Sequence, residues 1–120
     1  MSVYAQFWDA LEARDWGRLG APVADDVIGT WPQSREKVRG RDALVRFMAA
    51  YPGDWHIAAE EEHTDAGGGA TRVAFSLDGE TVPGLTFFAS DSTGRIASFV
   101  EFWPEPYEPP PGREHLLERY

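Results

Sequence analysis

The sequence predicts an α+β fold, in which helices in the first part of the chain cover one face of a curved antiparallel sheet. Apolar residues recur with the helical period up to Tyr51, whereas four stretches of strand-forming residues separated by turns lie between Trp55 and Trp103. No strand–helix–strand alternation is present, so a parallel doubly wound sheet is not expected. Aromatic residues make up 13% of the 120 residues, which suits a large core or an apolar pocket.

Two helices are expected at the start of the chain. From Val3 to Arg14 the apolar residues follow the helical period, and Ser2 is placed to cap the first turn. Asp15 offers a second cap, for a short helix that must end before Pro22. The first helix is therefore predicted to be amphipathic, and the second to be short or irregular.

A first strand and a third helix are expected next. Val27 to Trp31 contains good strand formers and ends before Pro32, which suggests an edge or a strand end. The segment Gln33–Lys37 is polar and is predicted to be a connection. After Gly40 the helical period returns until Pro52 ends it.

The four later strands are expected to form an antiparallel meander, because short turns rich in Gly, Asp and Ser connect them. The predicted strands are Trp55–His63, Ala70–Leu77, Thr81–Ser90 and Arg95–Trp103. The chain is predicted to be a single domain, 1–120, with a Pro-rich tail at 104–120. Five prolines keep the first part of this tail extended, a last helical turn or two is expected after Arg113, and we expect the tail to pack over the pocket mouth or a dimer seam.

The charge of the chain argues against two classes of partner. Eleven Lys and Arg stand against twenty Asp and Glu, for a net charge of −9, so neither nucleic acid nor an anionic membrane is an expected partner. The chain has no Cys, which excludes disulfides and thiolate chemistry. The sequence contains no apolar run long enough to span a membrane, and its first residues do not have the pattern of a signal peptide. A cytoplasmic protein is therefore expected.

Several strings in the sequence resemble the nuclear transport factor 2-like superfamily, and in particular its SnoaL-like branch of small bacterial proteins. These strings are Phe7–Trp16, Ala24–Asp26, Gly40–Leu44, Gly94–Ile96 and Glu101–Trp103. The resemblance implies a cone, in which a bent sheet wraps the helices around an apolar pocket, and frequently a homodimer formed through the sheet. It leaves the function open, because similar proteins include isomerases, cyclases, dehydratases, epoxide hydrolases and proteins that only bind.

The catalytic groups of the ketosteroid isomerases in this superfamily are not found at the matching positions. The resemblance places Trp31 where those enzymes have their base, Phe7 where they have a Tyr, and Thr86 near their second acid. None of these three residues can perform the matching role, so this isomerase chemistry is not expected. The Asp-Arg-Asp relay of the epoxide hydrolases cannot be placed on neighbouring strands either.

Glu101 is the candidate catalytic residue. Strand alternation puts it on one face with Phe99 and Trp103, and the resemblance places that face inside the cone. A carboxyl among aromatic rings acquires a raised pKa and becomes a usable general acid or base. Alternatively, Glu101 pairs with an arginine, for example Arg35 or Arg39, or reaches solvent at the rim. A one-residue error in register would move Glu101 out of the pocket.

The remaining candidates would line the pocket or assist Glu101. The expected ligand-binding residues are Trp31, Gln33, Arg35, Tyr51, Trp55, Phe99 and Trp103. The aromatic members can equally be core, and the loop after Trp31 can be a solvated turn. His56 is a further candidate base, as in superfamily dehydratases. His56, Glu60 and Glu62 are expected on one face of a strand and Glu61 and His63 on the other, so no metal site is expected. No cofactor is expected either.

Two functions are therefore open. One is the binding of a small apolar or carbonyl-bearing metabolite in an aromatic pocket, with cofactor-free acid–base chemistry of the isomerase, cyclase or dehydratase type. The other is a non-catalytic module for ligand binding or dimerisation. A hollow cone around Glu101 would favour a ligand, and a filled one would favour the module.

Overall fold

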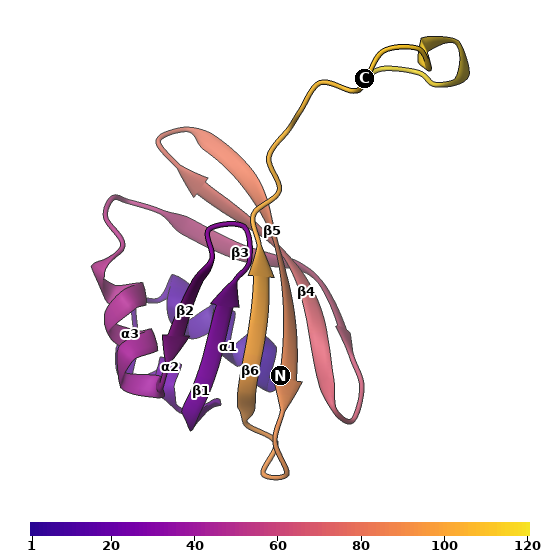
Figure 1. Cartoon of the computed structure of the whole chain (residues 1–120). Coiled ribbons are helices and arrows are strands. Elements are labelled where there is room, and N and C mark those ends of the chain that lie inside the picture. Colours follow the sequence, from indigo (N-terminus) through magenta and orange to yellow (C-terminus); the bar gives the residue numbers. More distant parts are fainter.

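The computed structural model describes all 120 residues and contains one sheet, three α-helices and a 3₁₀ turn (Figure 1). The elements are α1 (Val3–Glu12), α2 (Trp16–Gly20), β1 (Val23–Trp31), β2 (Glu36–Arg39), α3 (Arg41–Ala50), β3 (His56–Thr64), β4 (Gly68–Leu77), β5 (Glu80–Ser90), β6 (Ile96–Phe102) and η1 (Glu114–Leu116). The helices lie on one face of a strongly curved sheet. The α+β class predicted from the sequence is confirmed. No helix is long and apolar enough to span a membrane.

The sheet has the strand order β2-β1-β6-β5-β4-β3. The expected antiparallel meander from β3 to β6 is present. The sheet as a whole is mixed, however, because β1 runs parallel to β6, with Gly29 opposite Phe99. The prediction of an all-antiparallel sheet was wrong at this pair, since local patterns give no information on the direction of strands far apart in the chain.

The segment after Trp31 contains a strand where the sequence suggested only a polar connection. Glu36–Arg39 forms β2 and pairs with β1, with Trp31 opposite Glu36. The pairing was not visible in the sequence because this edge strand has only four residues, three of them exposed and charged. The hairpin carries the loop that becomes one wall of the site.

The helix ends follow the predicted caps. The Ser2 hydroxyl accepts a hydrogen bond from the Ala5 amide at 3.0 Å, and the Asp15 carboxylate accepts one from the Arg18 amide at 3.1 Å. Helix α1 ends at Glu12, two residues earlier than predicted, because the chain turns at Arg14 with a φ of 56°. One face of α1 is buried against the sheet, which places the core between them.

The tail leaves the end of β6 and projects away from the body of the molecule (Figure 1). Its residues after Trp103 are almost all exposed, including Leu116, Leu117 and Tyr120, and only the single turn η1 forms. Apart from Glu105, which borders the cavity, the tail therefore does not pack over the pocket mouth within one chain, contrary to the expectation. The physical reason is that the prolines hold the segment extended and direct it outward.

Candidate functional site

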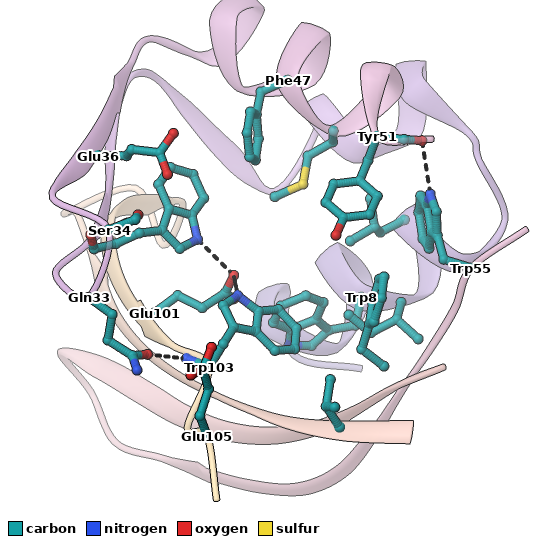
Figure 2. Close-up of a pocket in the computed structure, with 16 residues that line it drawn as sticks. Trp8, Gln33, Ser34, Glu36, Phe47, Tyr51, Trp55, Glu101, Trp103 and Glu105 are labelled. Atoms are coloured by element: carbon teal, nitrogen blue, oxygen red, sulfur yellow. Dashed lines mark hydrogen bonds between the residues drawn. The ribbon is translucent and has the colours of Figure 1, made fainter. Parts of the chain in front are cut away.

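A cavity of about 510 Å³ opens between α3 and the concave face of the sheet (Figure 2). Its volume is within the range of roughly 300 to 1,000 Å³ that is typical of ligand pockets. It is lined by 16 residues, 11 of them hydrophobic: Trp8, Leu11, Trp31, Gln33, Ser34, Glu36, Phe47, Met48, Tyr51, Trp55, Ile57, Phe75, Val82, Glu101, Trp103 and Glu105. The cone is thus hollow around the residue that the sequence singled out.

Glu101 lies on β6 in the wall of this cavity and is only 4% exposed. Its Oε1 accepts hydrogen bonds from the indole Nε1 of Trp31 at 3.0 Å and of Trp103 at 3.2 Å. Its Oε2 accepts one from the Thr86 hydroxyl at 2.5 Å, because Thr86 lies directly opposite on β5. No arginine forms an ion pair with Glu101, so the pairing that the sequence left open does not occur.

The environment of Glu101 shifts its protonation in one direction. Burial raises the pKa of this carboxyl, and the hydrogen bonds from Thr86, Trp31 and Trp103 oppose that effect without cancelling it. The pKa therefore lies above its ordinary value of 4.5. A carboxyl of this kind keeps its proton at higher pH than a solvated one and can serve as a general acid or base.

The position of Trp103 depends on a glycine of the neighbouring strand. The Trp103 ring lies over Gly84 of β5, where a Cβ would stand only 2.6 Å from Cζ3 of the indole. In the same way, the Phe99 ring covers Gly29 of β1, where a Cβ would stand 2.3 Å from Cζ. The absence of side chains at these two positions makes room for the rings that form and support the cavity wall.

Four of the predicted pocket residues form further parts of the wall. Trp31 packs against Phe47 of α3 at a centroid distance of 4.9 Å. Trp55 donates its indole N–H to the Tyr51 carbonyl at 3.2 Å, and the Tyr51 side chain points its hydroxyl into the cavity (Figure 2). Gln33 also lines the cavity, but its Oε1 accepts a hydrogen bond from the Trp103 amide at 2.6 Å and so ties the loop after β1 to β6.

The structure places two predicted binding residues outside the cavity. Arg35 is exposed at the turn between β1 and β2, with a φ of 62°, and it is not among the lining residues. Phe99 is buried in the core behind Trp31, with a ring centroid distance of 5.7 Å. Strand alternation correctly placed Phe99 on the inner face of β6. Its ring, however, is buried in the core and does not reach the cavity.

His56 also lies away from Glu101. It is exposed at the start of β3, where its Nδ1 is 2.7 Å from Glu12 Oε1 at the end of α1. The next residue, Ile57, lines the cavity, whereas His56 does not, in agreement with the alternation of side chains along a strand. The hydrogen bond and the charge of Glu12 raise the pKa of His56. The expectation of a His56–Glu101 pair in the pocket is therefore contradicted by the position of His56.

Several lining residues were missed by the sequence analysis or assigned to the core. Trp8, Phe47, Met48 and Phe75 border the cavity, although helical and strand spacing made them look like core. The carboxyl groups of Glu36 and Glu105 also border it. Glu105 continues the alternation of Glu101 and Trp103, so its side could have been inferred. Glu36 gave no signal, because its position depends on the unpredicted β1–β2 hairpin.

The positions matched to the ketosteroid isomerase groups have other roles in this protein. Phe7 is part of the buried core, at 1% exposure. Trp31 and Thr86 both form hydrogen bonds with Glu101. The cavity lining contains neither Asp nor Arg, so it holds no residues for the epoxide hydrolase relay. Glu101 is thus the one ionisable group that is buried in the cavity lining.

Comparison with known proteins agrees with the fold and with the resemblance noted above. The family model for the SnoaL-like domain matches residues 4–99. The crystal structure of a Kribbella flavida protein, provisionally assigned as a ketosteroid isomerase, has 37% identity and a TM-score of 0.92, and the match covers 98% of this chain and 87% of that one. No curated protein matches the chain.

Two more distant structures show the fold alone. A Shewanella denitrificans protein, provisionally assigned as a SnoaL-like polyketide cyclase, has 15% identity and a TM-score of 0.73, with 85% of this chain and 88% of that chain covered. A Catenulispora acidiphila protein with a ketosteroid isomerase-like fold, solved in complex with trimethylamine, has 14% identity and a TM-score of 0.72, with 84% of each chain covered. The family match over most of the chain and the Kribbella relative together show that the chain belongs to the SnoaL-like domain family.

Proposed function

We propose that this protein binds a small, largely apolar metabolite in the aromatic cavity and that Glu101 acts on it as a general acid or base. The observation that carries the proposal is a hollow space of about 510 Å³ with a buried carboxyl in its wall. The reaction class is a cofactor-free isomerisation, cyclisation or dehydration of a carbonyl-bearing molecule, since each of these requires proton transfer at carbon or oxygen.

The surroundings of Glu101 support this role. The two indole N–H groups and the Thr86 hydroxyl fix the carboxyl in one orientation, which holds the proton-transferring group in place before the ligand arrives. The apolar walls exclude water from a bound ligand and strengthen each polar contact that remains. The Tyr51 hydroxyl, which points into the same space, is placed to form a hydrogen bond with a ligand oxygen.

The test is a screen of carbonyl-bearing metabolites for turnover, followed by the substitution Glu101→Gln. Gln has nearly the same shape, and its amide can accept from both indoles and donate to Thr86, so the fold is expected to remain intact. For any substrate found, we expect kcat to fall by about 100-fold or more in the variant, since proton transfer by a positioned side chain contributes roughly 10²–10⁴-fold.

A matched control removes a carboxylate from the tail. Glu118→Gln has the same change in charge, lies outside the cavity and should leave kcat unchanged. If Glu101→Gln retained the full kcat on a substrate that the wild type converts, Glu101 would not be the acid or base. Binding with no turnover of any screened compound by the wild type would instead favour a non-catalytic binding module.

One observation favours this non-catalytic alternative. Both oxygens of Glu101 already have protein partners, as expected for a carboxyl that serves to hold two tryptophans and a strand together. In that case the cavity stores or senses a ligand, and Glu101 is part of its frame. The kinetic comparison above separates the two functions.

We also propose that two copies associate through the outer face of the sheet, in the cytoplasm. Phe87 is 52% exposed on the side of the sheet away from the helices, with Val100 opposite it and Phe102 at a centroid distance of 6.2 Å. An exposed group of apolar side chains of this kind is typical of a protein interface. The resemblance to a superfamily of frequent homodimers makes a second copy the natural partner.

A further inference from the structure

The charged groups that line the cavity are all of one sign. Three of the 16 lining residues are glutamates, and none is Lys, Arg or His. Glu101 is buried in the wall, whereas Glu36 and Glu105 are exposed, and Figure 2 shows all three around the same space. A cavity with low-dielectric walls and charges of one sign concentrates ligands of the opposite sign. The chain as a whole carries a net charge of −9, which acts in the same direction.

The apolar part of the lining also favours a positive charge. Seven lining residues are aromatic: Trp8, Trp31, Phe47, Tyr51, Trp55, Phe75 and Trp103. The faces of aromatic rings carry a negative potential, so they attract a cation held against them, and the attraction is stronger where water is excluded. An organic cation can therefore contact such rings without a carboxylate beside each ring.

The structure already contains a contact of this type at the outer side of the wall. The Arg14 guanidinium lies 3.3 Å from the centroid of the Trp55 ring, outside the cavity lining. Its charge is compensated by Glu12, with a nitrogen to oxygen distance of 3.9 Å. Arg14 occupies one face of Trp55, so the other rings of the lining provide the main surface for a ligand.

The arrangement of the acidic groups does not suit a metal ion. No three His, Asp or Glu side chains in the structure stand close enough together to hold one. One carboxyl is in the cavity wall and two are at exposed positions, so the negative charge is spread over the space. Carboxyl groups that are distributed in this way suit an organic cation with a hydrocarbon body better than they suit a metal ion.

We propose that the ligand of this cavity is an organic cation, namely a protonated amine or a quaternary ammonium compound with an apolar body. The cationic group lies among the aromatic rings and the carboxyl groups of Glu36, Glu101 and Glu105, and the hydrocarbon part fills the remaining apolar volume. This inference rests on the proposal that the cavity binds a metabolite and narrows the class of that metabolite.

The test compares four ligands that share a phenyl ring on a four-carbon chain and are cationic, neutral or anionic. They are phenylbutylamine, its trimethylammonium analogue, phenylbutanol and phenylbutanoate. Binding is followed by tryptophan fluorescence, which reports on the site because four of the five tryptophans line it, and is checked by calorimetry. We expect at least one of the two cations to bind about tenfold or more tightly than the alcohol, and the carboxylate to bind most weakly.

A double substitution tests whether the acidic groups are responsible. Glu36→Gln with Glu105→Gln removes the two exposed carboxylates, neither of which bonds to Glu101. The affinity for the preferred cation should fall by about threefold to tenfold, whereas the affinity for the alcohol should not change. Glu114→Gln with Glu118→Gln in the tail, outside the cavity lining, removes the same two charges and should leave both affinities unchanged.

The outcomes separate this inference from the proposed function. If the alcohol bound as tightly as both cations, or if the carboxylate bound most tightly, the cationic class would be wrong while a ligand-binding cavity would stand. If the cations were preferred but the double variant kept the full preference, the acidic groups would have no part in it. If none of the four compounds bound at millimolar concentration, both the cationic class and the binding of an apolar metabolite would be contradicted.

Discussion

At the scale of single residues, the protein is organised around one buried carboxyl. Burying a charge in an apolar wall is unfavourable unless hydrogen bonds compensate it, and Glu101 is compensated by three neutral donors and no cation. Neutral donors stabilise the charged form less than an arginine does. Both oxygens of Glu101 thus accept hydrogen bonds while burial raises the pKa of the carboxyl, and a raised pKa suits a group that transfers protons near neutral pH.

The raised pKa of Glu101 gives a prediction for the pH dependence of stability. The folded protein holds this proton more tightly than the unfolded chain, so the stabilisation is fully present below the unfolded pKa and is lost as pH rises through the folded pKa. Glu101→Gln removes this titration. As pH rises above 4.5, the ordinary pKa of Glu, the wild type should therefore lose free energy of unfolding relative to the variant.

Urea denaturation of both proteins across this pH range measures the difference. His56 and Glu12 titrate equally in the two proteins, so their contribution cancels in the comparison. Parallel stability curves for wild type and variant would show that the pKa of Glu101 is not raised. NMR titration of the Glu101 side chain provides the direct check.

At the scale of elements, the cavity depends on how closely β1 and β5 approach the rings carried by β6 and by Trp103 at its end. Gly84 lies under Trp103 and Gly29 under Phe99, so a ring replaces the missing side chain at each point. Trp103 in turn donates to Glu101 and, through its amide, to Gln33. A single glycine thus supports a wall residue, the carboxyl and the loop after β1.

Gly84→Ala is expected to displace the Trp103 ring, because the new Cβ would stand 2.6 Å from the indole. We expect a loss of about 1–3 kcal/mol in the free energy of unfolding, the usual cost of overpacking, together with weaker ligand binding. Urea denaturation and the fluorescence titration measure the two effects.

Gly17→Ala provides the matched control for this substitution. Gly17 is in helix α2 and has only the Asp15 carboxylate near its Cβ position, at 3.8 Å, so Ala should stabilise the protein by roughly 0.5–1 kcal/mol. Equal stability of Gly84→Ala and wild type would mean that the contact between Gly84 and Trp103 does not constrain the wall.

At the scale of the whole molecule, the two faces of the sheet have different surroundings. The inner face holds the core and the cavity, and the outer face presents Phe87, Val100 and Phe102. Neither the helices nor the tail of the same chain covers this outer group, because the tail projects away from the body. These exposed apolar side chains form the surface that the proposed second copy would cover.

Phe87→Ser is expected to convert a dimer into a monomer while leaving the fold intact, because Phe87 is half exposed and its removal opens no cavity in the core. Sedimentation velocity at several concentrations measures the change in mass, and circular dichroism confirms the fold. Tyr107→Ser removes an exposed aromatic ring of the tail and should leave the mass unchanged. A wild-type protein that sediments as a monomer at high concentration would rule out the dimer.

Much of this structure was predictable from local patterns in the chain. The caps Ser2 and Asp15, the third helix and the meander of four strands follow from periodicity and turn residues, because these signals act within a few residues. Strand alternation also put Glu101 and Trp103 on the inner face. Strand alternation did not exclude His56 from the pocket, because the sequence does not show which face of β3 is directed toward the cavity.

The sequence by itself therefore determined the α+β class, the family and the single carboxyl among aromatic residues. Only the tertiary structure decided that β1 runs parallel to β6, that the cone is hollow, and that Glu36 and Glu105 join Glu101 around one space. Strand direction, empty volume and the meeting of distant charges depend on contacts between residues far apart in the chain. No local pattern of side chains encodes such contacts, since they arise when the elements pack together.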